Sequence, residues 1–246
     1  MSVQVGASPC LSVPAASGMT MLRAVIFDFD GVITDSEILH FRAFNAVLTQ
    51  YGFGLTKPEY YKEYLGMSDA DCFRALIAEG RLPIQEPQIK GLGQQKTRVF
   101  EKLARTEGKI IEGVREFLNM LSAARVPIAI CSGALRAEIE LILDEAALRG
   151  FFDVIVSAEE VTRGKPDPEG FLLALQKLNE LWPEPITAER SIVIEDSHWG
   201  LKAAKAAGMR TIAVTNTYDA AQLKQADKVV ARLDELTMND LRRICA

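Results

Sequence analysis

The sequence predicts a doubly wound α/β core, built on a parallel sheet, with a helical segment inserted after the first strand. From residue 109 onward, short apolar runs alternate with amphipathic segments of helical period. This alternation is typical of a parallel sheet with helices on both faces. Between residues 37 and 108, only helical patterns occur. We therefore expect an α/β core of residues 22–36 and 109–246, and a helical domain of residues 37–108.

The first strand is expected over residues 24–27, because this run is apolar throughout and fits the centre of a parallel sheet. The inserted segment follows it. Apolar spacing within the insert predicts helices over 38–51, 57–64, 69–79 and 88–105. Gly80, Pro83 and Pro87 are expected to break them.

The second half of the chain begins with a predicted helix over residues 112–125, where one face carries Val114, Phe117, Leu118 and Leu121. Further helices are predicted over 135–148, 168–178 and 200–207. The apolar runs between them predict strands over 126–131, 152–156, 191–194 and 211–214, with 228–230 as an edge strand.

The composition is that of an ordinary globular protein, with 246 residues, 48% hydrophobic and 25% charged. The net charge of −5 and the absence of a Lys/Arg block argue against a nucleic-acid partner. No apolar run approaches the length of a membrane span. Residues 1–21 have the character of a disordered leader rather than a secretory signal. The oligomeric state is left open, and a monomer is compatible with the sequence.

The four cysteines are far apart in the sequence and form no CxxC pair. This spacing favours neither a disulfide framework nor a zinc site. We interpret them as reduced thiols, which predicts a cytoplasmic location.

The most informative segment comes directly after the first strand. Asp28 and Asp30 lie two residues apart and are followed by Gly31. Ligands of open α/β sheets bind at the carboxyl ends of the strands. An aspartate there can serve as a nucleophile, and a second one on the following turn can transfer a proton. By itself, the segment is also compatible with a simple turn rich in Asp and Gly.

Three other polar groups lie beside predicted strands of the same sheet. Ser132 and Gly133 follow one strand, Lys165 precedes a helix, and Glu195-Asp196 follows another strand. Each alone is compatible with a cap, a solvated loop or a surface turn. Together, a hydroxyl and an ammonium can hold a phosphoryl group, and carboxylates from separate strands can bind Mg²⁺.

On these residues we expect Asp28 to attack phosphorus, forming an aspartyl-phosphate. Asp30 would protonate the leaving oxygen and later activate water.

Four motifs carry a resemblance to a known superfamily. They are Asp28 through Glu37, Cys131-Ser132-Gly133, Lys165-Pro166-Asp167-Pro168, and Ile194 through Ser197 with its continuation to Met209. With them, the chain resembles the haloacid dehalogenase-like hydrolases over roughly residues 22–232. It is most similar to the branch of β-phosphoglucomutase and phosphoglycolate phosphatase.

The resemblance implies a Rossmann-like core and a helical cap domain that closes over the active site and selects the substrate. It implies Asp28 as nucleophile, Asp30 as general acid/base, and Ser132 with Lys165 as the phosphoryl-binding pair, beside Gly133. It also implies Mg²⁺ held by Asp28, the carbonyl of Asp30, Asp196 and Glu195, the last directly or through water. His40 is implied as a residue near the substrate, although a role in helix packing is equally open.

The function this predicts is a Mg²⁺-dependent phosphatase acting on a small phosphorylated metabolite. The alternative is a phosphohexomutase of the β-phosphoglucomutase type, in which an arginine after the cap-loop serine binds a second phosphate. Here Asp69 follows Ser68, and its charge would repel that phosphate. Two further alternatives, a dehalogenase and a non-catalytic regulator, do not account for Asp30 together with Glu195 and Asp196.

Overall fold

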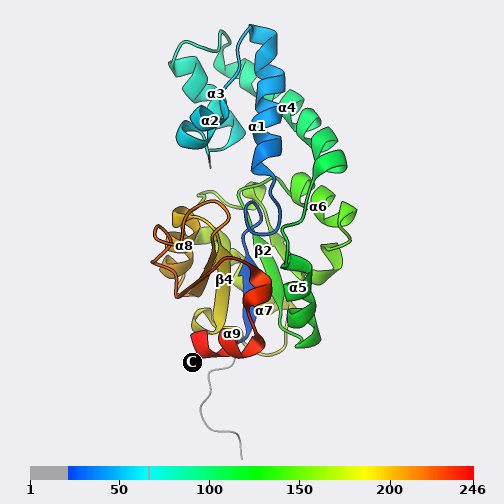
Figure 1. Ribbon diagram of the computed structural model, residues 1–246, viewed down its shortest axis with the longest axis vertical. Coiled ribbons are helices and arrows are strands. Elements are labelled where there is room, and N and C mark those ends of the chain that lie inside the picture. The colour runs from blue at the N-terminus through cyan, green and yellow to red at the C-terminus, as the bar shows by residue number, and fades with distance from the viewer. Residues whose placement is uncertain (1–21, 66) are drawn as a thin grey trace, which may run out of the picture.

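The computed structural model describes residues 22–65 and 67–246 (Figure 1). The expected leader, residues 1–21, lies outside this part of the chain, as does Gly66. The described residues form a doubly wound α/β core with a six-stranded sheet in the order β3-β2-β1-β4-β5-β6, and all neighbouring strands are parallel. The predicted fold class is confirmed.

The strands match the apolar runs of the sequence. They are β1 Ala24–Phe27, β2 Ile128–Cys131, β3 Val154–Val156, β4 Ser191–Glu195, β5 Arg210–Val214 and β6 Lys228–Val230. Strand β1 lies between β2 and β4, with Phe27 opposite Ile130 on one side and Ile194 on the other. The residues that follow these three strands therefore meet at one edge of the sheet.

Successive residues of β1 point to opposite faces of the sheet, and each face has its own core. Helices α5 Val114–Ala123, α6 Arg136–Glu145 and α9 Met238–Ile244 cover the face to which Val25 and Phe27 point. Helices α7 Glu169–Leu181 and α8 His198–Ala206 cover the face of Ala24 and Ile26. Burial on both faces explains why the strand is apolar throughout.

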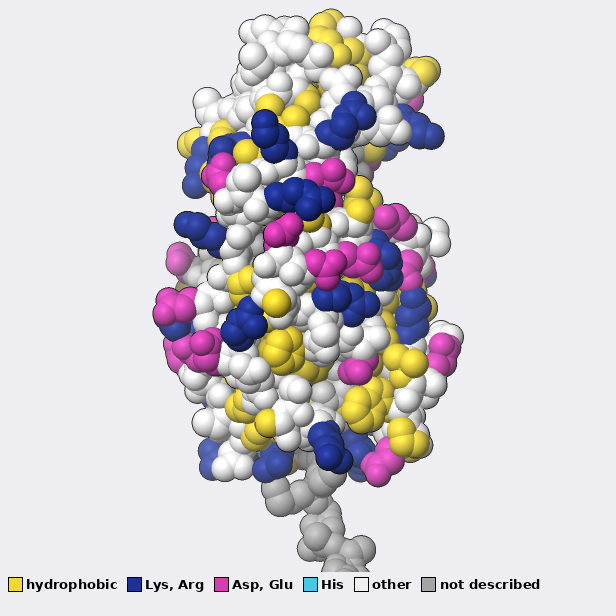
Figure 2. Space-filling view, turned by 90° about the vertical axis from the view of Figure 1, so that its right-hand side faces the viewer, with side chains coloured by type: hydrophobic (Ala, Val, Ile, Leu, Met, Phe, Trp, Pro, Cys, Tyr) yellow, Lys and Arg dark blue, Asp and Glu magenta, His cyan; other side chains and the backbone are white. Residues whose placement is uncertain are grey.

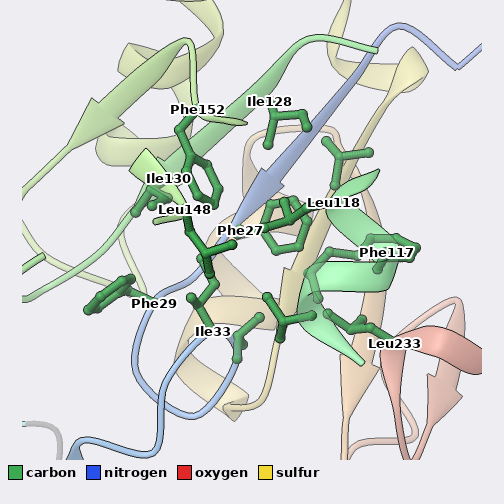
Figure 3. Packing of buried hydrophobic residues seen from close by; sticks show 14 of the residues in the cluster. Phe27, Phe29, Ile33, Phe117, Leu118, Ile128, Ile130, Leu148, Phe152 and Leu233 are labelled. Atoms are coloured by element: carbon green, nitrogen blue, oxygen red, sulfur yellow. The ribbon is translucent and has the colours of Figure 1, made fainter. Parts of the chain in front are cut away.

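Aromatic packing fixes the centre of the first of these cores. The ring of Phe27 makes edge-on contacts with Phe117 of α5, at 5.9 Å between centroids, and with Phe152, at 6.0 Å (Figure 3). Such edge-to-face pairs add specific geometry to the burial of apolar area. The strand that precedes Asp28 is thus held firmly in the core.

Between β1 and α5, the named elements in the described part of the chain are all helices. It contains α1 Glu37–Leu48, α2 Lys57–Glu63, α3 Asp69–Ala78 and α4 Glu86–Glu107. These helices bury a hydrophobic cluster of their own, to which Phe44, Tyr60, Phe73 and Leu92 belong. Figure 1 shows them above the carboxyl edge of the sheet, with α1 and α4 side by side.

Several predicted boundaries differ from the structure by one to three residues. Pro87 does not break a helix: it lies in the first turn of α4, where its missing N–H needs no partner. Helix α8 begins at His198 instead of Gly200, because Ser197 caps it by accepting a hydrogen bond from the Gly200 N–H. Strand β2 begins at Ile128, two residues later than predicted.

None of the helices in the described ranges is long and apolar enough to cross a membrane. Figure 2 shows Lys/Arg and Asp/Glu side chains interspersed over one face of the molecule.

Candidate active site

Carboxylates gather where β1 and β4 end. Asp28 follows β1, Glu195 is the last residue of β4, and Asp196 follows it. All three are buried, and one carboxylate oxygen from each lies within 4.8 Å of the others. The structure therefore brings together three predicted site residues that are up to 168 positions apart in the sequence.

Burial raises the pKa of Asp28 to about 7, although the nearby Lys165 ammonium opposes this. Burial, with the charges of Glu195 and Asp28, also raises the pKa of Asp196 well above its usual range. Clustered carboxylates of this kind disfavour their own ionised forms unless a cation compensates them. The donor set consists of oxygens only, which fits a hard cation such as Mg²⁺.

Lys165 supplies one compensating charge. Its Nζ lies 2.6 Å from Asp28 Oδ1 and 2.6 Å from Glu195 Oε1. Burial alone would lower the pKa of Lys165, but the Asp28 and Glu195 carboxylates raise it above its usual range. The side chain is therefore a fixed ammonium between the ends of two strands.

Asp30 lies two residues after Asp28, next to Ser36 and Ser132. Ser36 Oγ donates a hydrogen bond to Asp30 Oδ1. Burial raises the pKa of Asp30, and the hydrogen bonds from Ser36 and Ser132 oppose the increase. Ser132 is the first residue after β2, and its Oγ also accepts a hydrogen bond from the Ala134 N–H at 3.0 Å. Gly133, the next residue, is exposed in the turn.

Glu195 and Asp196 are held by neighbours that fix their orientation. Glu195 Oε2 accepts hydrogen bonds from the backbone N–H groups of Asp196, at 3.0 Å, and Ser197, at 2.9 Å, and from Ser197 Oγ at 2.8 Å. Asp196 Oδ2 accepts one from Thr217 Oγ1. The sequence analysis did not identify Thr217. It could have been found by the rule that ligands bind at the carboxyl ends of parallel strands, because Thr217 lies in the loop after β5.

Two glycines leave space for these carboxylates. A Cβ atom on Gly200 would lie 1.6 Å from Glu195 Oε1, and one on Gly31, where φ is +75°, would lie 1.9 Å from Asp196 Oδ2. Neither position can accept a side chain unless a carboxylate moves.

Gly200→Ala should therefore lower the free energy of unfolding by about 1–3 kcal/mol, because the added methyl group overpacks the buried Glu195. Urea unfolding measures the change. Gly91→Ala is the matched control, since Gly91 lies in α4 with no atom within 4 Å of an added Cβ. The control should leave stability unchanged or raise it by up to about 1 kcal/mol. Equal stability of Gly200→Ala and the wild type would contradict the proposed close approach.

His40 lies in α1, in the helical insert. Its Nδ1 is 2.6 Å from Lys96 Nζ, and its ring stacks on Phe100 at 4.1 Å between centroids. Burial lowers the pKa of His40 well below its usual range, and the charge of Lys96 lowers it further. An ammonium can only donate, so Nδ1 accepts and the proton of the neutral ring is on Nε2.

Lys96 also pairs with Asp69, at 2.9 Å between Nζ and Oδ1, although its side chain is only 1% exposed. The sequence analysis missed Lys96. A signal was present, because Lys96 falls on the apolar face of α4 in register with Ile89, Leu92 and Phe100. A lysine at such a position is rarely buried without partners.

Comparison with known proteins shows the family of the chain. The family model described as haloacid dehalogenase-like hydrolase matches residues 25–214. This stretch contains the helical insert and the candidate site residues from Asp28 to Asp196. The chain belongs to this family. The resemblance that the motifs predicted is confirmed.

Two relatives of this haloacid dehalogenase-like hydrolase are phosphatases. The phosphorylated carbohydrates phosphatase of Thermotoga maritima is 32% identical over 91% of this chain and 100% of its own length. The validoxylamine A 7'-phosphate phosphatase of Streptomyces hygroscopicus subsp. limoneus is 35% identical over 88% of this chain and 96% of its own.

Among solved structures, CbbY from Rhodobacter sphaeroides in complex with phosphate is similar, with a TM-score of 0.79 and 26% identity. The match covers 88% of this chain and 96% of that one. The chain is thus an enzyme of the hydrolase family, with phosphatases among its relatives.

Proposed function

We propose that this enzyme is a Mg²⁺-dependent phosphatase that hydrolyses a small phosphorylated metabolite, a sugar phosphate or similar monoester, through an aspartyl-phosphate. One observation carries the proposal: Lys165 Nζ contacts both Asp28 and Glu195 at the edge where the strands end. The cluster thus joins a nucleophile, a fixed cation and further carboxylates within one site. The phosphatase relatives support the same class of substrate.

In the first half of the reaction, a carboxylate oxygen of Asp28 forms a bond to phosphorus while the bond to the leaving oxygen breaks. The leaving oxygen takes the electron pair and receives a proton from Asp30. Burial raises the pKa of Asp30, so its protonated form is available for this step. The products are the free alcohol and an aspartyl-phosphate at Asp28.

In the second half, the carboxylate of Asp30 removes a proton from water, and the resulting oxygen attacks phosphorus. The bond between phosphorus and Asp28 breaks, which releases inorganic phosphate and regenerates the Asp28 carboxylate. Lys165 and the Ser132 hydroxyl hold the phosphoryl oxygens, and the turn at Gly133 leaves room for them. Both halves therefore use the same small set of side chains.

Mg²⁺ would be held by the carboxylates of Asp28 and Asp196 and by the carbonyl of Asp30. Glu195 is more suited to a water-mediated contact, because Lys165 and the Ser197 groups already occupy both of its carboxylate oxygens. When bound, the metal supplies charge compensation for the phosphoryl oxygens.

Residues 37–108 act in this proposal as a cap that closes over the site, with His40 near the substrate. The contacts between α4 and α6 place the insert next to the core. The described cysteines, Cys72, Cys131 and Cys245, are free and buried, in keeping with the cytoplasmic location that we expect.

The test of hydrolysis against the mutase alternative is an incubation with β-glucose 1-phosphate, Mg²⁺ and a priming bisphosphate, in which both products are measured. We expect release of inorganic phosphate with multiple turnovers and no glucose 6-phosphate above background. The reason is that Asp69 follows Ser68, where the resemblance implies an arginine in the mutase, and its negative charge would repel a second phosphate. Asp69 also neutralises the nearby Lys96.

Asp28→Asn protein that is expressed and purified in the same way gives the background activity of contaminating phosphatases. Faster formation of glucose 6-phosphate than of free phosphate would contradict the proposal and favour the mutase.

A further inference from the structure

A second group of charged side chains lies on the side of Asp30 that faces the helical insert. At its centre is Lys96 Nζ, which contacts Asp69 Oδ1 at 2.9 Å and His40 Nδ1 at 2.6 Å. Lys96 is close enough to Asp30 to affect its pKa. Lys96 forms an ion pair with Asp69, and its positive charge also opposes the rise of the pKa values of Asp30, Glu37 and Glu138.

Glu138 comes from the core side, in the first turn of α6, and is only 3% exposed. One oxygen, Oε2, accepts a hydrogen bond from the Leu135 N–H at 3.3 Å. The other, Oε1, is buried and has no hydrogen-bond partner among the residues that the structure describes. Burial raises the pKa of Glu138 to about 7, while the charge of Lys96 opposes this rise and those of Asp69 and Asp30 add to it. Glu138 is therefore an anion only above neutral pH, and we assign its carboxyl group to this cluster. A buried acceptor without a partner is costly, and a ligand that donates to it recovers that cost.

Glu37 completes the cluster from α1. Its Oε1 accepts a hydrogen bond from Tyr60 OH at 2.6 Å, which fixes its position next to Asp30. Since Asp69 already neutralises Lys96, the cluster offers acceptors rather than a free cation. An anionic group brought here would meet like charges, whereas a hydroxyl or an ammonium would find acceptors.

We propose that Glu138, with Asp69, selects substrates whose leaving group carries hydroxyl or ammonium donors and rejects those with a second phosphate or a carboxylate. This inference rests on the proposed function, since it takes the leaving group to lie beside Asp30. It assigns a role in substrate specificity to Glu138, a residue of the core that is in none of the four motifs.

The test uses two substrates with the same six-carbon chain and the same phosphate position. Glucitol 6-phosphate ends in a hydroxymethyl group, and 6-phosphogluconate ends in a carboxylate. Their kcat/KM values are compared about two pH units above the pKa of Glu138, where its carboxylate is ionised. Where turnover is slow, their inhibition constants against p-nitrophenyl phosphate are compared instead. We expect the wild type to favour the alditol about tenfold, and Glu138→Gln to reduce this preference to about twofold, because glutamine keeps the acceptor for Leu135 but removes the charge.

Asp144→Asn is the matched control, since Asp144 is an exposed carboxylate on the same helix, and it should keep the tenfold preference. Asp69→Asn provides a second variant of the cluster, which should reduce the preference in the same direction. Thermal unfolding of each variant shows whether it is folded.

The outcomes separate the inference from the proposed function. Failure of the wild type to hydrolyse p-nitrophenyl phosphate or either sugar phosphate would overturn the proposed function itself. Hydrolysis of p-nitrophenyl phosphate with equal preference for the alditol and the carboxylate would overturn only the inference. An unchanged preference in both folded variants would also overturn it and would leave Glu138 a purely structural residue.

Discussion

Asp28→Asn protein should release no phosphate above background while it keeps the wild-type fold. We expect kcat to fall by about 10⁴-fold or more, because a neutral amide is a poor nucleophile and no other group can take over the covalent step. The fold should survive, since Lys165 keeps its contact with Glu195 and the loss of one charge relieves repulsion among the clustered carboxylates. Phosphate release and far-ultraviolet circular dichroism measure the two effects.

Asp35→Asn is the matched control for this variant. Asp35 is an exposed carboxylate in the same motif, so its loss should leave turnover within about twofold of the wild type. Rapid quenching with a ³²P-labelled substrate adds a direct readout, because only protein with Asp28 should carry label as an acyl-phosphate. Substantial turnover, or label retained on Asp28→Asn protein, would show that another residue is the nucleophile.

The strands of the sheet could be predicted because each one corresponds to a continuous run of apolar residues in the sequence. Residues 24–27 and 192–194 are apolar throughout, and such short runs are typical of buried central strands. Parallel strands in a doubly wound sheet also end at one edge, so Asp28 and Glu195 could be expected to meet before any coordinates were known. The structure adds what the pattern cannot supply, namely that Lys165 bridges them at 2.6 Å.

The second cluster could not be predicted in the same way. His40 and Lys96 are 56 residues apart, and their contact depends on how α1 and α4 pack. Helical periodicity places both residues on faces of their helices but does not fix the angle or register between the helices. The sequence analysis therefore assigned Asp69 a repulsive charge but did not predict the ion pair with Lys96 that positions it.

Removal of divalent metal should abolish activity, and Mg²⁺ should restore it. The reason is the excess of charge: three carboxylates offer oxygens within 4.8 Å of one another, and Lys165 supplies only one compensating cation. Activity in EDTA should fall by about 10³-fold or more, since charge compensation at the phosphoryl group is lost. Asp196→Asn should weaken the response to Mg²⁺ most. Glu195→Gln should weaken it less, because we expect Glu195 to bind the metal through water.

Thermal unfolding gives a readout of binding that does not depend on turnover. A ligand that binds only the folded state, present at 100 times its dissociation constant, adds about 2.7 kcal/mol to the free energy of unfolding. Mg²⁺ should therefore raise the melting temperature of the wild type and of the control Asp219→Asn, whose carboxylate is exposed in the loop after β5. It should raise that of Asp196→Asn much less. Full activity in EDTA, together with no Mg²⁺-dependent stabilisation, would contradict the metal site and favour a metal-free reaction at Asp28.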